Sequence, residues 1–232
     1  SYAMKKIDLS VVPPKQKKYL LAELKIISEH KCKFLIKYYN TCIQDDTICI
    51  VMEFCQQGTL ETIMKSKQLS TEKIWKYFAQ LCGGLKYLHD HNIIHRDLKS
   101  SNIMIDNNDN LKIIDFGVSK ILNNYMKYTK SFVGTPYNMS PELLKNVFYD
   151  YKIDIWALGI ILYQMTHNNK LPFMAKSINQ LNESITQAKF IMHPNVIAIF
   201  QTIIKRCIQV SPHRRIKLND LLRMQNIKKY VI

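Results

Sequence analysis

Three polar side chains at short spacing indicate a site that handles phosphate. Asp97 and Asn102 lie in the run H-R-D-L-K-S-S-N at 95–102, and Asp115 opens D-F-G thirteen residues after Asn102. Carboxylate and amide oxygens suit a hard cation such as Mg²⁺, whose coordination is completed by phosphates and waters. Phosphoryl transfer needs the phosphates and the metal held still and one carboxylate aimed at the attacking hydroxyl. These three side chains supply that set of oxygens.

The composition is that of a globular protein. The 232 residues are 47% hydrophobic and 22% charged, which is enough for a sizeable core. The longest strongly apolar run, 155–163, is too short to span a bilayer, and no signal peptide opens the chain. The six cysteines form no C-x-x-C pair and no metal-ligand spacing. We therefore expect reduced thiols, an intracellular protein and no membrane span.

The chain is strongly basic, with 33 Lys and Arg residues, 18 Asp and Glu residues and a net charge of +15. One interpretation is attraction to an acidic partner, a nucleic acid or an anionic surface. The other is a Lys-rich composition spread along the whole chain, without one basic block. We favour the second interpretation, and because no nucleic-acid motif is present we expect no specific nucleic-acid partner.

Apolar spacing predicts the elements upstream of the acidic motifs. Residues 2–7 predict a strand that carries a lysine, and residues 15–29 predict an amphipathic helix after a proline turn. Residues 48–54 predict a buried strand, and Thr59 is placed to cap a short helix that runs through residue 64.

Further elements are predicted around and beyond the acidic motifs. Thr71 opens a helix to about His91, and its Gly83-Gly84 pair permits close packing. Short strands at 103–105 and 111–114 predict a hairpin. Residues 153–166 are apolar nearly all round, which predicts a buried helix. Later helices are expected at 177–187, 196–209 and 218–226.

In order and spacing, these motifs resemble those of the eukaryotic serine/threonine protein kinase domains, from Tyr2 nearly to the C-terminus. The resemblance implies an α+β, bilobal fold. Residues 1–54 correspond to a truncated, β-rich small lobe that lacks the family's first two strands, and residues 55–232 correspond to a mainly helical large lobe. It also implies ATP and Mg²⁺ as cofactors and proteins as substrates. No feature of the sequence specifies an oligomeric state.

The resemblance assigns roles to the acidic motifs. Asp97 corresponds to the base that accepts the proton of the substrate hydroxyl, and Asn102 and Asp115 correspond to the ligands of Mg²⁺. Lys99 stands where serine/threonine kinases place a lysine near the transferred phosphate. This lysine is the main reason to expect a serine or threonine acceptor.

The same resemblance assigns Lys5, in A-M-K at 3–5, to the α- and β-phosphates of the nucleotide. Glu23, eighteen residues further on, corresponds to its partner on the following helix. The alternative for Lys5 is a solvated surface lysine, and Lys6 beside it keeps that alternative open. Strand alternation points only one of the two lysines inward.

Residues 51–55 resemble the hinge between the lobes. Met52 corresponds to the residue behind the adenine. The carbonyl of Glu53 and the backbone of Cys55 correspond to the groups that hydrogen-bond the adenine edge. Ala3 and Met104 would sandwich the ring. Plain core packing is the alternative for these apolar residues, and it is compatible with a nucleotide site.

Residues 134–142 resemble the end of the activation segment, and they imply a buried ion pair between Glu142 and Arg215. Asp154 corresponds to the residue that holds the catalytic-loop backbone. Four residues are expected to be regulatory. Thr135 corresponds to a contact of Asp97 and Lys99. Ser131 corresponds to the activation phosphosite, with Thr129 as the rival site, and Arg96 is the cation expected to pair with the phosphate.

Three segments are similar to NimA-related (Nek) kinases: K-I-D-L-S at 6–10, F-V-G-T-P-Y at 132–137 and L-P-F-M-A-K at 171–176. Asn138 departs from the second tyrosine usual there. The group is associated with mitosis, centrosomes and cilia. We therefore expect a cell-cycle or cytoskeletal signalling protein that is cytoplasmic and associated with the cytoskeleton or centrosome, or nuclear.

The glycine-rich loop G-x-G-x-x-G of the family is absent, because the chain opens on the third strand. Residue 1 is Ser, so we expect a piece of a longer product. Two functions stay open: an active serine/threonine kinase domain, and a catalytically impaired, pseudokinase-like scaffold. Lys5, Asp97, Asn102 and Asp115 favour the first, and the missing loop favours the second.

Overall fold

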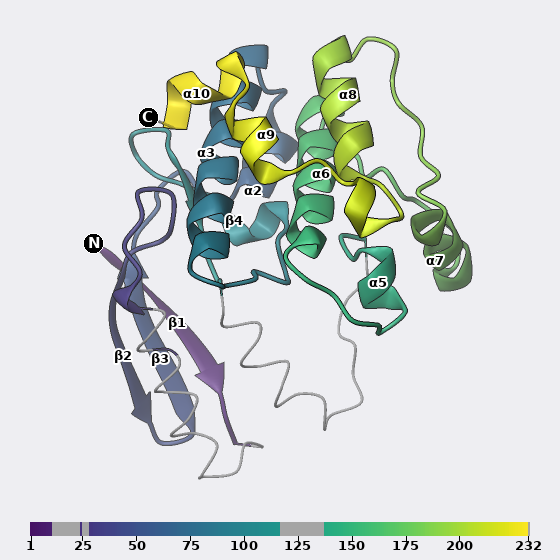
Figure 1. Cartoon of the computed structure of the whole chain (residues 1–232). Helices are drawn as coiled ribbons and strands as arrows, with labels where there is room; N and C mark the ends of the chain where they lie inside the picture. Colours follow the sequence, from purple (N-terminus) through teal and green to yellow (C-terminus); the bar gives the residue numbers. More distant parts are fainter. Residues whose placement is uncertain (11–23, 25–27, 117–136, 232) are drawn as a thin grey trace.

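The fold is taken from a computed structural model, which describes residues 1–10, 24, 28–116 and 137–231. Figure 1 shows a small sheet at one side of a larger, mainly helical part. The predicted α+β organisation is confirmed. The boundary between the lobes near residue 54 stays a prediction. Within the described residues, no helix is long and apolar enough to cross a bilayer.

The small part is an antiparallel sheet of β1 (Tyr2–Asp8), β2 (Tyr38–Gln44) and β3 (Thr47–Glu53), in the order β1-β3-β2. The expected first strand and the expected buried strand are β1 and β3. Along β1, Lys5 points to the partly buried face and Lys6 is exposed. The register pairs Ala3 with Met52 and Lys5 with Ile50. The sheet thus brings the lysine strand and the strand before the expected hinge together.

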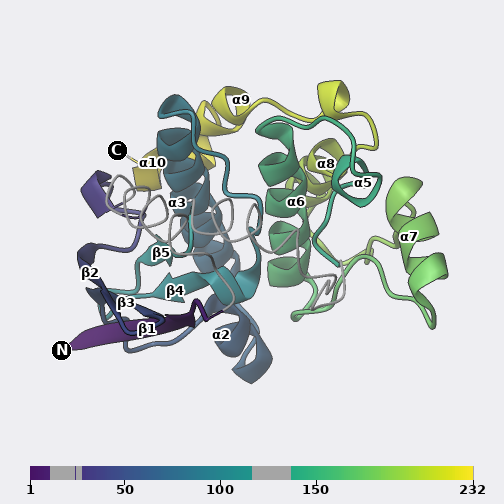
Figure 2. The same ribbon diagram turned by 90° about the horizontal axis from the view of Figure 1, so that it is seen from below.

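The centre of the large part is formed by α3 (Thr71–Asp90) and α6 (Lys152–Thr166), which run side by side in Figures 1 and 2. Ser70 caps α3 by accepting a hydrogen bond from the Lys73 backbone N–H at 3.3 Å. A Cβ on Gly83 would lie 2.6 Å from the Phe34 ring, so this position needs glycine for close packing. Nearly every residue of α6 is buried, as predicted.

The remaining elements surround this pair. Before α3 comes α2 (Leu60–Ser66), capped by Thr59. After α3 come η1 (Ser100–Asn102) and the predicted hairpin of β4 (Ile103–Ile105) and β5 (Leu111–Ile113). The rest are α5 (Pro141–Leu144), α7 (Ile178–Thr186), α8 (Ala198–Cys207), η2 (Pro212–Arg214), α9 (Leu218–Leu222) and α10 (Gln225–Val231).

Two predictions need comment. The helix expected at 218–226 is two short helices, α9 and α10, because α9 ends at Leu222 and a new helix starts at Gln225. Most of the helix expected at 15–29 lies outside the described residues. Leu24, Ser28 and Glu29 are helical, and Leu24 is buried.

Candidate active site

A buried carboxylate on α6 fixes the loop that carries Asp97. Asp154 accepts hydrogen bonds from the backbone N–H groups of His95 at 3.0 Å and Arg96 at 3.1 Å. Its Oδ2 also lies 2.8 Å from Nε2 of His89. Arg96 has a φ of 71°, a strained value for a residue with a side chain. The three contacts to Asp154 hold this turn, as predicted for Asp154.

Three of the expected catalytic residues meet directly after this turn. Nζ of Lys99 lies 2.8 Å from Oδ2 of Asp97. The Asn102 amide nitrogen donates to the Asp97 carbonyl at 2.8 Å and to its carboxylate at 3.0 Å. The Asp97 side chain is 46% exposed, so solvent and a substrate can reach it. The amide oxygen of Asn102 is the atom that can bind a cation.

The hairpin brings Asp115 to the same place. The Ile114 backbone N–H donates to the Asn102 carbonyl at 3.0 Å, and the Ile114 carbonyl lies 3.0 Å from Nε2 of His95. Asp115 follows directly, and its carboxylate accepts a hydrogen bond from Lys5 of β1 at 2.7 Å. One cation of the sheet and one carboxylate of the helical part therefore form an ion pair across 110 residues of sequence.

The expected hinge joins the two parts. Met52 is buried beside Ala3, and Met104 lies partly buried on β4. The side-chain carboxylate of Glu53 accepts a hydrogen bond from the Lys37 backbone N–H at 2.8 Å. The backbone carbonyl of Glu53 takes no part in this contact. The Cys55 carbonyl accepts a 3.4 Å hydrogen bond from Gly58, so its N–H is the better group for a ligand.

Burial and the nearby Glu53 raise the pKa of the Cys55 thiol to about 11. The thiol therefore stays neutral at physiological pH and acts as a small apolar group beside the hinge.

The donor set suits Mg²⁺ held partly by phosphate. Within the described residues, no three His, Cys, Asp or Glu side chains gather closely enough to hold a metal ion alone. Asp115 and Asn102 offer one carboxylate and one amide oxygen at neighbouring positions. Mg²⁺ commonly takes one or two carboxylates and completes its shell with phosphates and waters. The residues present fit that mode.

Comparison with known proteins decides the family. A family model described as "Protein kinase domain" matches residues 1–227. The chain belongs to the protein kinase domain family. It is similar to human serine/threonine-protein kinase Nek5, at 33% identity over 95% of this chain and 32% of Nek5. It is also similar to human Nek2, at 33% identity over 94% of this chain and 52% of Nek2.

A third relative is the probable serine/threonine-protein kinase nek3 of Dictyostelium discoideum, 32% identical over 98% of this chain and 21% of that protein. The kinase domain thus spans between a fifth and about half of the length of these relatives. The expected similarity to Nek kinases is confirmed.

The end of the activation segment is anchored as expected. Arg215 donates two hydrogen bonds to the Glu142 carboxylate, at 2.6 and 2.8 Å, and both side chains are buried. Arg215 also lies over the Trp156 ring, 5.1 Å from its centroid. Four expected residues lie outside the described ones: Glu23, Thr129, Ser131 and Thr135. Among the described residues the partner of Lys5 is Asp115, and a contact with Glu23 stays a prediction.

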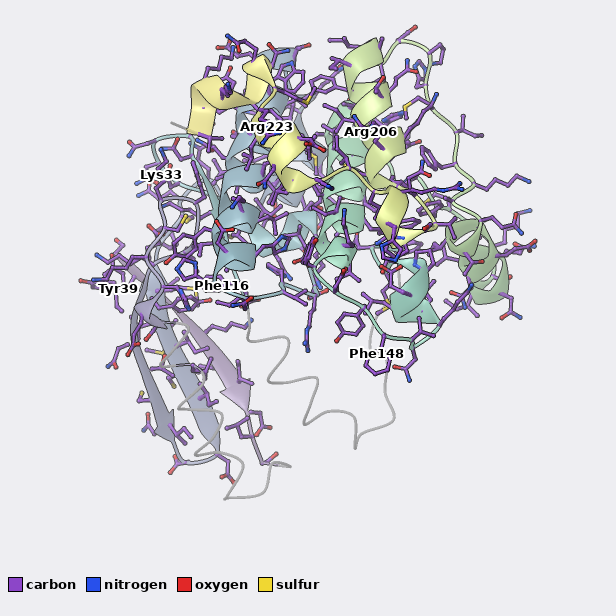
Figure 3. The ribbon with its side chains drawn as sticks, viewed as in Figure 1. Lys33, Tyr39, Phe116, Phe148, Arg206 and Arg223 are labelled. Carbon is purple, nitrogen blue, oxygen red and sulfur yellow. The ribbon has the colours of Figure 1, made fainter. Side chains whose placement is uncertain are left out.

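Sequence reasoning missed Tyr38, on β2. Its ring packs edge-on against Phe116, with centroids 5.5 Å apart. Figure 3 places Phe116 where the sheet meets the lower end of α3. Burial and the charge of Asp115 raise the pKa of Tyr38, so its hydroxyl stays neutral beside the site. No spacing rule links residues 38 and 116, and only the fold brings them together.

Sequence reasoning also missed Asp109, in the β4–β5 turn. Its carboxylate accepts hydrogen bonds from Tyr77 at 2.6 Å and from Lys73 and Lys76 at 3.0 Å each. Burial alone would raise the pKa of Asp109, but these three donors outweigh it and lower the pKa to about 2. The spacing of the donors on α3, at i, i+3 and i+4, is a signal that could have indicated one shared acceptor.

Proposed function

We propose that this kinase domain transfers the γ-phosphoryl group of ATP to serine and threonine hydroxyls of protein substrates. The observation that carries the proposal is the convergence of Asp97, Lys99 and Asn102 on the Lys5–Asp115 pair, through the backbone bond from Ile114 to Asn102. These groups come from β1, the loop after α3, η1 and the segment after β5. Core packing requires no such gathering of polar groups.

Each group has a role that its position supports. Asp97 is exposed and can accept the proton of an incoming hydroxyl. Lys99, beside it, can bind the transferred phosphate. Asp115 and Asn102 would hold Mg²⁺, which offsets charge on the phosphates when bound. Lys5 can bind the α- and β-phosphates while it stays near Asp115.

The nucleotide base would lie at the hinge. Ala3 and Met104 would enclose the adenine, with Met52 behind it. The Glu53 carbonyl and the Cys55 N–H would hydrogen-bond its edge, because the Cys55 carbonyl is already bonded to Gly58. Glu23 is proposed as a second partner of Lys5.

Arg96 is proposed to receive a regulatory phosphate on Ser131, with Thr129 as the rival site and Thr135 as a contact of Asp97. Support comes from the Arg96 side chain, whose buried Nε has no hydrogen-bond partner among the described residues. Its guanidinium lies 5.4 Å from the centroid of the Tyr149 ring. A phosphate would supply the missing acceptor.

A role in cell-cycle or cytoskeletal signalling, at the cytoskeleton or centrosome or in the nucleus, is supported by the relatives alone. Several are named Nek, and a yeast protein described as "Cell cycle serine/threonine-protein kinase CDC5/MSD2" is 36% identical over 76% of this chain. The pseudokinase-like scaffold is not supported, because Lys5, Asp97, Asn102 and Asp115 are all retained and these relatives are named as kinases.

The test is transfer of labelled phosphate from ATP–Mg²⁺ to casein by the purified protein. We expect incorporation on serine and threonine that falls ~10²–10⁴-fold in Asp97→Asn, because a positioned general base contributes that much. Asp90→Asn, on the exposed end of α3, is the matched control and should keep full activity. Equal labelling by the wild type and Asp97→Asn, or label mainly on tyrosine, would contradict the proposal.

A further inference from the structure

A groove of about 580 Å³ lies on the helical part, between the loop after α7 and the C-terminal end of α8. Figure 1 places α7 and α8 on the side of the molecule away from the sheet. Five apolar side chains line the groove: Ala188, Phe190, Met192, Ile208 and Val210. Lys205 and Arg214 line it as well, and both are exposed. No acidic residue lines the groove.

Lys205 and Arg214 belong to a basic stretch near the C-terminus, and of the basic residues in that stretch they alone line the groove. Residues 205–229 hold eight Lys and Arg residues and one acidic residue, Asp220. Seven of the eight are exposed, and the eighth is Arg215, paired with Glu142. Arg206 and Arg223 both lie on the upper part of the large lobe, away from Phe116 (Figure 3).

The two cations of the groove have no acidic neighbour. Within the described part of the chain, no carboxylate lies at ion-pair distance from Lys205 or Arg214. Neither the active site nor the α6–α8 packing uses them. Their charge is therefore available to a ligand with carboxylates on either side of an apolar anchor.

The shape and chemistry of the groove favour a peptide over a nucleic acid. Its volume is in the range that encloses small ligands or a few side chains. The Phe190 ring packs edge-on against Tyr163 and Phe173 at 5.9 Å each, so the core holds it and it offers no stacking platform for bases. Two lining cations are too few for a phosphate backbone, which is recognised by a longer row of charges.

We propose that this groove binds an extended acidic peptide segment of a protein partner. One or two large apolar side chains of the peptide occupy the groove beside Ile208 and Val210, and flanking Asp or Glu residues pair with Lys205 and Arg214. The site goes beyond phosphoryl transfer and uses none of the active-site residues. Binding alone tests it, whatever the outcome of the activity assay.

The probe is a fluorescein-labelled peptide of sequence Glu-Asp-Glu-Leu-Phe-Glu-Asp-Glu, followed by fluorescence anisotropy in 150 mM KCl. We expect a Kd of ~10–100 μM, as suits a small site with one apolar anchor and exposed ion pairs. The double variant Lys205→Glu, Arg214→Glu should bind at least ~10-fold more weakly, since it replaces two attractions with two repulsions. A peptide with Ser-Ser in place of Leu-Phe should also lose binding.

The matched control is Arg223→Glu with Lys228→Glu, which makes the same change of charge just after α9 and on α10, outside the groove. It should bind the peptide as the wild type does. If reversal in the groove unfolds the protein, Lys205→Gln with Arg214→Gln replaces it, with a loss of a few-fold expected. Equal weakening in both double variants would overturn the proposal. So would equal binding of the Ser-Ser peptide, or tighter binding to a uridine 12-mer or to phosphatidylserine vesicles.

Discussion

At the scale of single residues, the choice between Lys5 and Lys6 shows what the fold adds. The sequence predicts that one of two adjacent lysines points inward, and alternation alone does not say which. In the sheet, Lys5 lies on the partly buried face and reaches Asp115, whereas Lys6 lies on the exposed face. The contact with Asp115 distinguishes the two lysines, because an exposed lysine away from the site contributes little to phosphate binding.

Lys5→Met should lower kcat/KM for ATP by ~10²-fold or more, because it removes a preorganised cation from the phosphates. Lys6→Met removes the same charge one residue away and should leave kcat/KM within about twofold. Steady-state kinetics with varied ATP measure both. Similar losses in the two variants would place the phosphate-binding lysine elsewhere.

Residues grouped by a motif could be predicted, and residues grouped only by folding could not. Asp97 and Asn102 sit five residues apart, and their contact follows from the turn between them. The family resemblance predicts the Glu142–Arg215 pair, and the structure confirms it. Tyr38 and Asp109 carry no motif, since each depends on a partner that tertiary packing supplies.

At the scale of elements, long periodic patterns gave the reliable predictions. The 3.6-residue spacing of apolar residues in α3 and the apolar run of α6 both extend over more residues than a strand or a loop would. The split of 218–226 into α9 and α10 involves local capping at Arg223, whose N–H bonds back to Asn219 and Leu221. Such a break between two helices leaves the spacing of the apolar residues unchanged, so the sequence pattern does not predict it.

The packing of α6 on α8 depends on Gly159. A Cβ there would lie 2.6 Å from Cβ of Cys207 and 2.8 Å from Cγ1 of Ile208. Gly159→Ala should gain about 1 kcal/mol of stability from helix propensity. It should lose ~1–3 kcal/mol because the added methyl group overpacks the contact between α6 and α8. We expect a net loss of stability in urea unfolding. Thr202→Ala, on the exposed face of α8, should be nearly neutral, and a stabilised Gly159→Ala would contradict the close approach.

The β4–β5 hairpin is tied to α3 through Asp109, and this tie should depend on pH. The pKa of Asp109 is lowered to about 2, against about 3.9 for an unfolded aspartate. Its contribution is therefore fully present above pH ~4 and is lost as the pH falls toward 2.

Asp109→Asn should cost ~1.5–3 kcal/mol at pH 7, the range for hydrogen bonds to charged groups. The gap to the wild type should shrink on acidification to pH 2–3. Asp90→Asn is the control, since Asp90 forms an exposed pair with Lys86 at 2.6 Å and should change stability by less than ~1 kcal/mol. Unfolding in urea across this pH range measures both, and a gap that stays constant would exclude the proposed ionisation.

At the scale of the whole molecule, the candidate active site is made of two parts that the sequence presents separately. The Lys5–Asp115 pair and the Tyr38–Phe116 contact cross from the sheet to the helical part. A sequence pattern does not indicate such contacts, because the two partners of each contact lie far apart in the chain. A ligand that binds both parts should therefore stabilise the molecule as a unit.

Saturating ADP with Mg²⁺ should raise the thermal midpoint by several degrees. At a ligand concentration of 100 Kd the stabilisation is about 2.7 kcal/mol, and each kcal/mol shifts the midpoint by about 2–4 °C in a protein of this size. EDTA should remove most of that shift if Asp115 and Asn102 act through the metal. Asp115→Asn should show a small shift that no longer responds to Mg²⁺. Asp45→Asn, in the exposed β2–β3 turn, should keep the full metal-dependent shift. Midpoints that rise equally with and without Mg²⁺ in the wild type would mean that the nucleotide is held by Lys5 and the hinge, without the metal.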